Sequence, residues 1–99
     1  MHKTNEHFNK LSPGEAERLA ILAEECGEVI QVVGKILRHG YTSHHPDNPT
    51  VDNEELLYKE IIDVYASVAM LVKSFDIDTI NPKDVEDAEI RKKKYSHHQ

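Results

Sequence analysis

The chain has 99 residues, of which 38% are apolar and 30% are charged, and its formal charge is −6 at pH 7. This length predicts a single domain over residues 1–99, and the acidic balance argues against binding long nucleic acid through its phosphates. The longest apolar run, Val64–Val72, contains Ser67 and is too short to cross a bilayer, so no membrane partner is expected. The single cysteine, Cys26, and the lack of an apolar leader favour a cytoplasmic location.

The first long helix is expected over about residues 12–39. Ser12, Pro13 and Glu15 form a start signal, because serine can cap the helix, proline fits its first position, and the glutamate completes a capping box. Gly40 suits the C-terminal stop. Apolar side chains recur between these ends at three- and four-residue spacing, which is typical of an amphipathic helix: Leu19, Leu22, Cys26, Val29, Val33, Ile36 and Leu37. The cysteine lies on this apolar face and is expected to be a small buried side chain.

Residues 40–52 are rich in proline, asparagine and histidine and are expected to form a loop. A second helix is expected over about residues 53–74, with Asp52 and Glu55 repeating the capping pattern. Its centre, residues 61–72, is apolar on nearly every side, which is typical of a fully buried helix. A chain of 99 residues can hardly cover such a helix, so a homo-oligomer, either a homodimer or a homotetramer, is predicted to share this core.

A third helix is expected over about residues 81–95. Asn81 can cap it, and Asp84 lies in its first turn. Consecutive cations end it, as the helix dipole favours: Arg91, Lys92, Lys93 and Lys94. A short additional helix is expected over residues 6–11. The sequence therefore predicts an all-α fold, a helical bundle completed by homo-oligomerisation.

Four carboxylates lie within two of the most apolar stretches, as the pairs Glu25/Glu28 and Glu60/Asp63. Side chains three residues apart are neighbours on a helix, so each pair can hold one ion, and two antiparallel helices can bring both pairs together. An ionised carboxylate that faces a core is costly unless a positive charge accompanies it, and neither motif contains Lys, Arg or His. The two pairs therefore predict a divalent cation site, although a solvated motif is the common alternative for either pair alone.

The ligand type narrows the choice of ion. All four side chains offer hard oxygen donors, which Mg²⁺ and Mn²⁺ prefer, whereas zinc sites usually include histidine or cysteine. A ferritin-like di-iron bundle would carry Glu-x-x-His, but Glu28 and Asp63 occupy the positions where histidine would stand. Mg²⁺, with Mn²⁺ as a substitute, is therefore the predicted cofactor, and a metal site of this kind suggests chemistry.

An EExxE…ExxD signature is typical of the MazG-like all-α nucleoside triphosphate pyrophosphohydrolases. Two segments of this chain resemble it: Leu22-Ala23-Glu24-Glu25-Cys26-Gly27-Glu28-Val29 and Lys59-Glu60-Ile61-Ile62-Asp63-Val64. Relatives in that superfamily include dimeric dUTPases and phosphoribosyl-ATP pyrophosphohydrolase. The resemblance covers about residues 19–72. The spacer from Glu28 to Glu60 is somewhat longer than is usual in the family, and residues 40–52 account for this, so the subfamily and the preferred base stay open.

The resemblance implies a helical bundle that assembles as a dimer or as a dimer of dimers. It implies Mg²⁺ bound by the four matching carboxylates, Glu25, Glu28, Glu60 and Asp63. It also implies hydrolysis of a (deoxy)nucleoside triphosphate to the monophosphate and pyrophosphate. Glu24 matches the first glutamate of the signature and would be a further ligand or would orient the water. Glu24 or Glu25 could accept the proton of the attacking water, and the residues do not decide between them.

Basic residues near two helix ends are candidate substrate-binding groups. Lys35 and Arg38 follow the acidic face of the first helix by one or two turns and could meet phosphate oxygens. Arg91, Lys92 and Lys94 could close over a triphosphate from the same or a neighbouring subunit. Solvated cations near a helix C-terminus are the alternative for both groups.

Two other functions are compatible with these residues. One keeps the fold and takes phosphoribosyl-ATP as the substrate. The other is a non-catalytic helical module whose carboxylates bind a structural ion or pair with the arginines of a partner. Turnover of a triphosphate distinguishes the enzymes from the module, and stabilisation by Mg²⁺ distinguishes an ion site from solvated acids.

Overall fold

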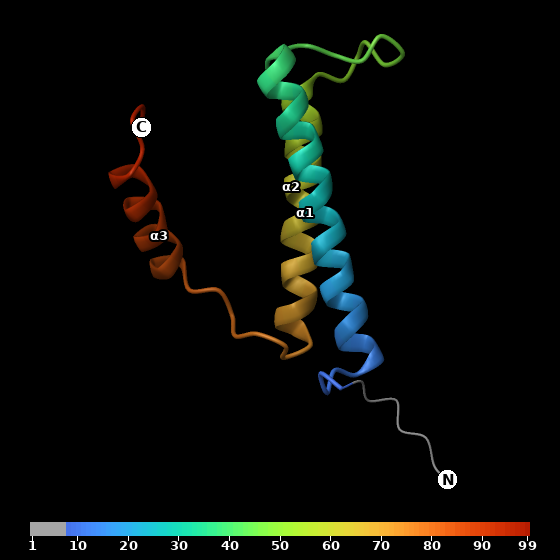
Figure 1. Ribbon diagram of the computed structural model, residues 1–99, viewed down its shortest axis with the longest axis vertical. Helices are drawn as coiled ribbons and strands as arrows, with labels where there is room; N and C mark the ends of the chain where they lie inside the picture. The colour runs from blue at the N-terminus through green and yellow to red at the C-terminus, as the bar shows by residue number, and fades with distance from the viewer. Residues whose placement is uncertain (1–7) are drawn as a thin grey trace.

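The computed structural model describes residues 8–99, which form a long helical hairpin and a separate shorter helix (Figure 1). In chain order the helices are α1 (Pro13–His39), α2 (Asn53–Lys73) and α3 (Pro82–Lys94). α1 and α2 lie side by side and antiparallel, whereas α3 contacts neither of them. Within the described residues there is no strand beyond an isolated bridge between His44 and Asp52. The predicted all-α fold is confirmed.

The helix bounds lie within one residue of those expected from the sequence. The short helix expected over residues 6–11 is not formed by residues 8–11, which contain a turn, and residues 6 and 7 lie outside the described part of the chain. None of the helices in the described part combines the length and apolar character that a membrane crossing requires.

The ends of α1 are fixed by local chemistry. The Ser12 hydroxyl accepts a hydrogen bond from the Glu15 amide at 3.1 Å, and the Glu15 carboxylate accepts one from the Ser12 amide at 2.8 Å, which completes the predicted capping box. At the other end the Gly40 amide donates to the Ile36 carbonyl at 2.7 Å. Gly40 has φ of 87°, a left-handed conformation that glycine adopts without steric cost. The chain therefore leaves α1 sharply at this residue.

The loop over residues 40–52 is tied to the start of α2. The Asn53 side-chain amide donates to the Gly40 carbonyl at 3.0 Å, and the Asn53 backbone amide donates to the Ser43 carbonyl at 2.9 Å. Asn53 is one of the few buried side chains among residues 8–99, which is consistent with this double role. Asp52 caps α2 through the Glu55 amide at 2.9 Å. These bonds fix the loop end of the hairpin.

An ion pair fixes the opposite end of the hairpin. The Arg18 guanidinium donates two hydrogen bonds to the Asp76 carboxylate, from Nε at 2.6 Å and from Nη2 at 3.0 Å. Asp76 is held in place because its amide donates to the Leu71 carbonyl at 2.9 Å, next to Phe75 with φ of 61°. Hydrogen bonding to Arg18 lowers the pKa of the Asp76 carboxyl from its usual range. The pair joins the first turns of α1 to the chain just beyond α2.

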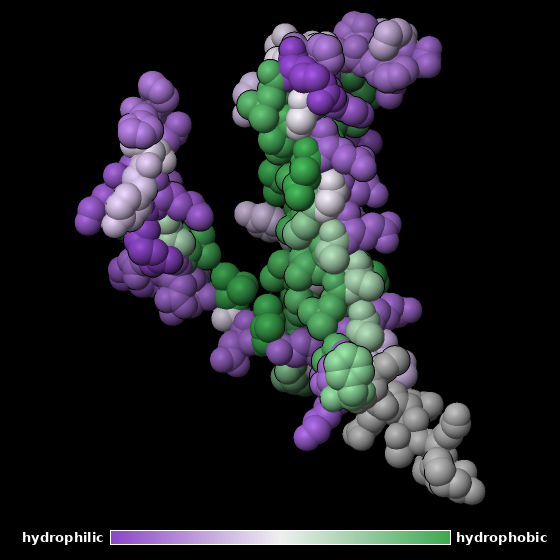
Figure 2. All heavy atoms as spheres, in the orientation of Figure 1, coloured by the Kyte–Doolittle hydropathy of each residue, from purple (hydrophilic) through white to green (hydrophobic). Residues whose placement is uncertain are grey.

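The single chain has little core. Among residues 8–99 the buried side chains are Val32, Leu71, Asn53 and Ser67. The radius of gyration is 18.0 Å, whereas a compact domain of this length has about 13 Å. The expectation that α2 is buried on all sides is therefore not met within one chain. The expectation that Cys26 is buried is wrong for the single chain, because it lies on a side of α1 that α2 does not cover. Figure 2 shows apolar side chains exposed along the hairpin.

Removing the ion pair should loosen the hairpin. We expect Asp76→Asn to lower the thermal midpoint at pH 7 by roughly 5 °C, because bidentate charge-assisted bonds are lost. The lowered pKa of Asp76 means that this stabilisation is present above its ordinary pKa and is lost as pH falls through the lower folded value. The difference between wild type and variant should therefore shrink below about pH 4. Asp78→Asn, at an exposed position nearby, is the control, and equal midpoints for all three proteins at pH 7 would contradict the role of the pair.

Candidate metal centre

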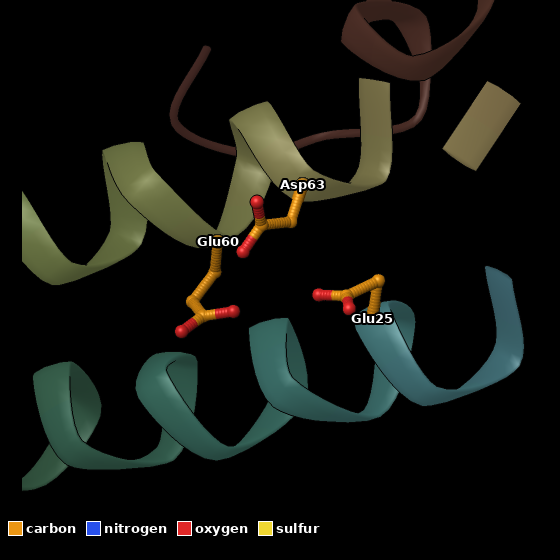
Figure 3. Close-up of side chains that lie close together, drawn as sticks. All are labelled: Glu25, Glu60 and Asp63. Atoms are coloured by element: carbon orange, nitrogen blue, oxygen red, sulfur yellow. The ribbon is translucent and has the colours of Figure 1, made fainter. Parts of the chain in front are cut away.

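Three carboxylates converge between α1 and α2. Glu25 extends from α1, and Glu60 and Asp63 extend from α2, so that their carboxylates point toward one another in the space between the helices (Figure 3). One oxygen of each side chain lies within 4.8 Å of one oxygen of each of the others. Oxygens that share one Mg²⁺ at about 2.1 Å lie roughly 3–4 Å apart. Small side-chain rotations are therefore enough to close the cluster around one ion.

Helix periodicity places these groups on the contact face. Glu60 and Asp63 are one turn apart, and Ser67 follows them by one further turn with a buried side chain. Ser67 Oγ donates to the backbone carbonyl of Asp63 at 2.8 Å, which satisfies the buried hydroxyl within its own helix. On α1, the buried Val32 lies two turns beyond Glu25 on nearly the same face. The carboxylates thus belong to the interior side of both helices.

Glu28, the fourth predicted ligand, lies beside the cluster rather than within it. It is exposed and is not one of the three converging carboxylates. Its carboxyl is nonetheless close enough to Glu60 for its charge and a polar contact to raise the pKa of that group. The exposed Glu24 also lies near Glu25 and contributes to the raised pKa of that group. Both residues therefore border the cluster on its solvent side.

Burial and like charges both disfavour ionisation in the cluster. Desolvation is the main cause that raises the pKa of Glu60, followed by the charges of Glu28 and Asp63, while Lys59 acts in the opposite direction. Desolvation also raises the pKa of Glu25, followed by the charge of Asp63. No Lys, Arg or His among residues 8–99 forms an ion pair with the three carboxylates. A bound cation would offset both the desolvation and the repulsion between these carboxylates.

One oxygen of Glu60 marks where a cation would bind in the cluster. Glu60 Oε2 is buried and has no hydrogen-bond partner. A buried carboxylate oxygen without a donor is unfavourable, and native structures usually provide a donor, a water or an ion at such a point. The chemistry of the donor set, three carboxylates with hard oxygens, fits Mg²⁺ or Mn²⁺. The residues present therefore fit the predicted ion.

A pocket lies next to the cluster, at the loop end of the hairpin. Its volume is about 360 Å³, and α1, the loop and α2 line it with Lys35, Arg38, His39, Ser43, His44, His45, Pro46, Asn53 and Leu56. Lys35 is ten residues beyond Glu25, or about 15 Å along α1, and Leu56 is one turn before Glu60 on α2. The predicted substrate-binding residues of α1 thus lie in one cationic pocket beside the carboxylates. The sequence did not indicate the contribution of Asn53, which depends on how the loop folds.

The basic end of α3 does not join this site. Arg91, Lys92 and Lys94 are exposed, and α3 contacts neither α1 nor α2. Among the predicted substrate-binding residues, the structure therefore brings those of α1 near the cluster and leaves those of α3 apart. Comparison of the chain with protein-family models, with curated proteins and with solved structures gives no match.

Divalent cations should stabilise the protein through this cluster. We expect Mg²⁺, at about 100 times its Kd, to raise the thermal midpoint by roughly 10 °C, since a ligand of the native state adds to its stability. The effect should weaken from pH 7 to pH 5, because protons compete with the metal for carboxylates whose pKa values are raised. Calorimetry with and without Mg²⁺ or Mn²⁺ measures both effects.

Glu60→Gln tests the same cluster without metal. Folding raises the pKa of the Glu60 carboxyl, so its ionised form lowers the stability of the folded protein. This loss of stability is absent below the ordinary pKa of glutamate and is complete above the raised pKa. At pH 7 without metal, Glu60→Gln should therefore unfold at a higher temperature than wild type, and it should lose most of the Mg²⁺ effect. Glu54→Gln, exposed on the same helix, should keep that effect. If Mg²⁺ raised the thermal midpoint of both variants equally, Glu60 would not be a ligand of the ion.

Proposed function

We propose that this protein is a Mg²⁺-dependent nucleoside triphosphate pyrophosphohydrolase. It cleaves a (deoxy)nucleoside triphosphate to the monophosphate and pyrophosphate, and it works as a homo-oligomer in a reducing cytoplasm. The observation that carries the proposal is the convergence of three carboxylates on facing helices around an unpartnered oxygen of Glu60. The resemblance of the two motifs to the EExxE…ExxD signature supports the same activity.

The residues divide the chemical work among them. Glu25, Glu60 and Asp63 hold the ion, and Glu28 completes its surroundings from the solvent side. A Mg²⁺ ion held by these carboxylates would neutralise negative charge on the phosphate oxygens and would lower the pKa of water. Glu24 or Glu25 accepts the proton of that water, which adds to phosphorus while the bond to the pyrophosphate oxygen breaks. Positioning and charge neutralisation account for most of the rate in such reactions.

The pocket supplies a place for the rest of the substrate. Its volume of about 360 Å³ falls within the range of roughly 300–1,000 Å³ that is common for small-molecule sites. Helical side chains lean toward the N-terminus of their helix, so Lys35 leans from its position toward the carboxylates. Lys35 and Arg38 can therefore neutralise phosphates that the ion does not reach. Arg91, Lys92 and Lys94 contribute, in this proposal, from a neighbouring subunit.

A nucleotide panel tests the activity. Wild-type protein with Mg²⁺ should release pyrophosphate from at least one canonical or modified triphosphate, or from phosphoribosyl-ATP, with the monophosphate identified by chromatography. Glu60→Gln and Asp63→Asn should each lower kcat/KM by roughly 100-fold or more, because each removes a metal ligand. If the wild type binds Mg²⁺ but is inert across the panel, the alternative of a non-catalytic metal-binding module is correct.

Lys35→Ala tests the assignment of the pocket. We expect KM to rise roughly tenfold with a much smaller change in kcat, since a cation that binds phosphate in both ground and transition states contributes uniform binding. Lys73→Ala, which removes an exposed lysine at the far end of α2, is the matched control. Equal KM values for the two variants would place the triphosphate elsewhere.

A further inference from the structure

One polar side chain in the pocket at the loop end of the hairpin is buried but only partly hydrogen-bonded. Asn53 lines this pocket and exposes 4% of its surface. Its Nδ2 donates to the Gly40 carbonyl at 3.0 Å, and this bond fixes which end of the amide is nitrogen and which is oxygen. No donor among residues 8–99 bonds to Asn53 Oδ1. Asn53 therefore carries an acceptor of fixed orientation that lacks a partner in the described part of the chain.

This oxygen meets open space at the pocket. Among residues 8–99, Glu60 Oε2 is the side-chain oxygen that is fully enclosed and has no partner. Asn53 Oδ1 is therefore not fully enclosed, and the pocket of about 360 Å³ is the open space that Asn53 lines. An acceptor in the wall of a pocket is satisfied by water or by a ligand that donates a hydrogen bond. The pocket thus favours a ligand that brings an N–H or O–H group to this point.

The rest of the lining offers mainly hydrogen-bond donors. It contains no Asp or Glu, and the two cations Lys35 and Arg38 only donate. The Asp47 amide donates to His45 Nδ1 at 3.1 Å, so the proton of the neutral imidazole lies on Nε2, which is then a donor. His44 Nδ1 donates to the His45 carbonyl at 3.1 Å, which leaves its Nε2 as one further acceptor. The lining therefore suits a group that combines an N–H with carbonyl oxygens.

Asn53 lies where the base of a bound nucleotide would reach. It precedes Glu60 by seven residues, or about 10 Å along α2. Seven residues are nearly two full turns, so Asn53 and Glu60 share one face of the helix. Under the proposed function, Glu60 belongs to the cluster that holds the reacting phosphate. Because the sugar separates that phosphate from the base, the base rather than the sugar extends to Asn53.

We propose that Asn53 selects bases that present a ring N–H beside a carbonyl oxygen, which is the lactam group of hypoxanthine, guanine, uracil and thymine. The ring N–H donates to Asn53 Oδ1, and the neighbouring carbonyl oxygen accepts from a donor of the lining such as His45 Nε2. Adenine and cytosine carry a ring nitrogen lone pair beside an amino group. In the same position they place acceptor against acceptor and donor against donor. This inference rests on the proposed function, because the cluster must hold the phosphates for the base to lie in the pocket.

Matched pairs of substrates measure this selection. Deoxyinosine and deoxyadenosine triphosphates differ only at the lactam edge, and so do the deoxyuridine and deoxycytidine triphosphates. We expect the lactam member of each pair to have a kcat/KM higher by roughly tenfold or more, which is the discrimination typical of one paired contact to a base edge. Equal kcat/KM values within both pairs would overturn the inference and leave the proposed hydrolysis standing.

Asn53→Ala tests the role of the side chain through the ratio of kcat/KM within each pair. The ratio should fall toward one, because the lost acceptor affects the lactam member most. The variant also breaks the bond to Gly40, but a looser loop lowers both members of a pair alike. Asp52→Ala is the matched control, since it removes the cap at the same end of α2 and does not line the pocket, and it should keep the wild-type ratio. An unchanged ratio in Asn53→Ala would overturn the assignment.

Binding without turnover separates this inference from the proposed hydrolysis and does not depend on how the variants fold. The α,β-methylene analogues of the same four nucleotides keep the base but cannot be cleaved between the α and β phosphates. Calorimetric titration of wild type with each analogue in Mg²⁺ should give a Kd roughly tenfold lower for the lactam member of each pair. An inert protein with this preference would contradict the hydrolysis and keep the pocket assignment. Equal Kd values, or no binding of any analogue, would overturn the assignment.

Discussion

Three carboxylates meet where α1 and α2 pack against each other, and their mutual repulsion opposes the contact that brings them together. The hairpin overcomes this because both of its ends are fixed by other groups. Arg18 and Asp76 join the helices at one end, and Asn53 ties the loop to α2 at the other. The cluster lies between these two anchors, which hold α1 and α2 against each other on either side of it. Because the helices cannot separate to relieve the repulsion between the carboxylates, binding a cation is the favourable way to relieve it.

The hairpin has two chemically different sides, and the same helices provide both. The carboxylates and neighbouring charged residues occupy one side, while the other is apolar along its length. α2 packs against α1 with one side and exposes a second apolar side. Its apolar surface must therefore extend well beyond one narrow stripe, which explains why its centre is apolar nearly all round. The single chain therefore leaves the second apolar side of the hairpin exposed. Under the proposed function, a neighbouring copy covers the apolar side and the ion binds on the charged side, so assembly and metal binding depend on the same two helices.

Local signals in the sequence were sufficient for the helices and for most of the cluster. Ser12 and Glu15 specify the start of α1 through bonds within one turn, and the spacing of Glu60 and Asp63 places both on one face. The offset of Glu28 depends on how the two helices are rotated against each other, which no local pattern encodes. The expected burial of Cys26 failed because the pattern shows that a side chain is apolar, not which neighbour covers it. The separation of α3 from the hairpin is a non-local property of the same kind.

The loop of residues 40–52 connects the site to substrate choice. Ser43, His44, His45 and Pro46 of this loop line the pocket together with Lys35 and Arg38 of α1. Under the proposed function, phosphates bound at the cluster extend toward these two cations, because both lie on the loop side of the ion. Under the proposed function, the nucleoside then reaches the loop, where the His44 and His45 imidazoles and a backbone held by Asn53 can offer hydrogen bonds and flat contacts to a base. Under the proposed function, the carboxylate cluster is therefore responsible for the reaction, and the length and fold of this loop determine which base is accepted.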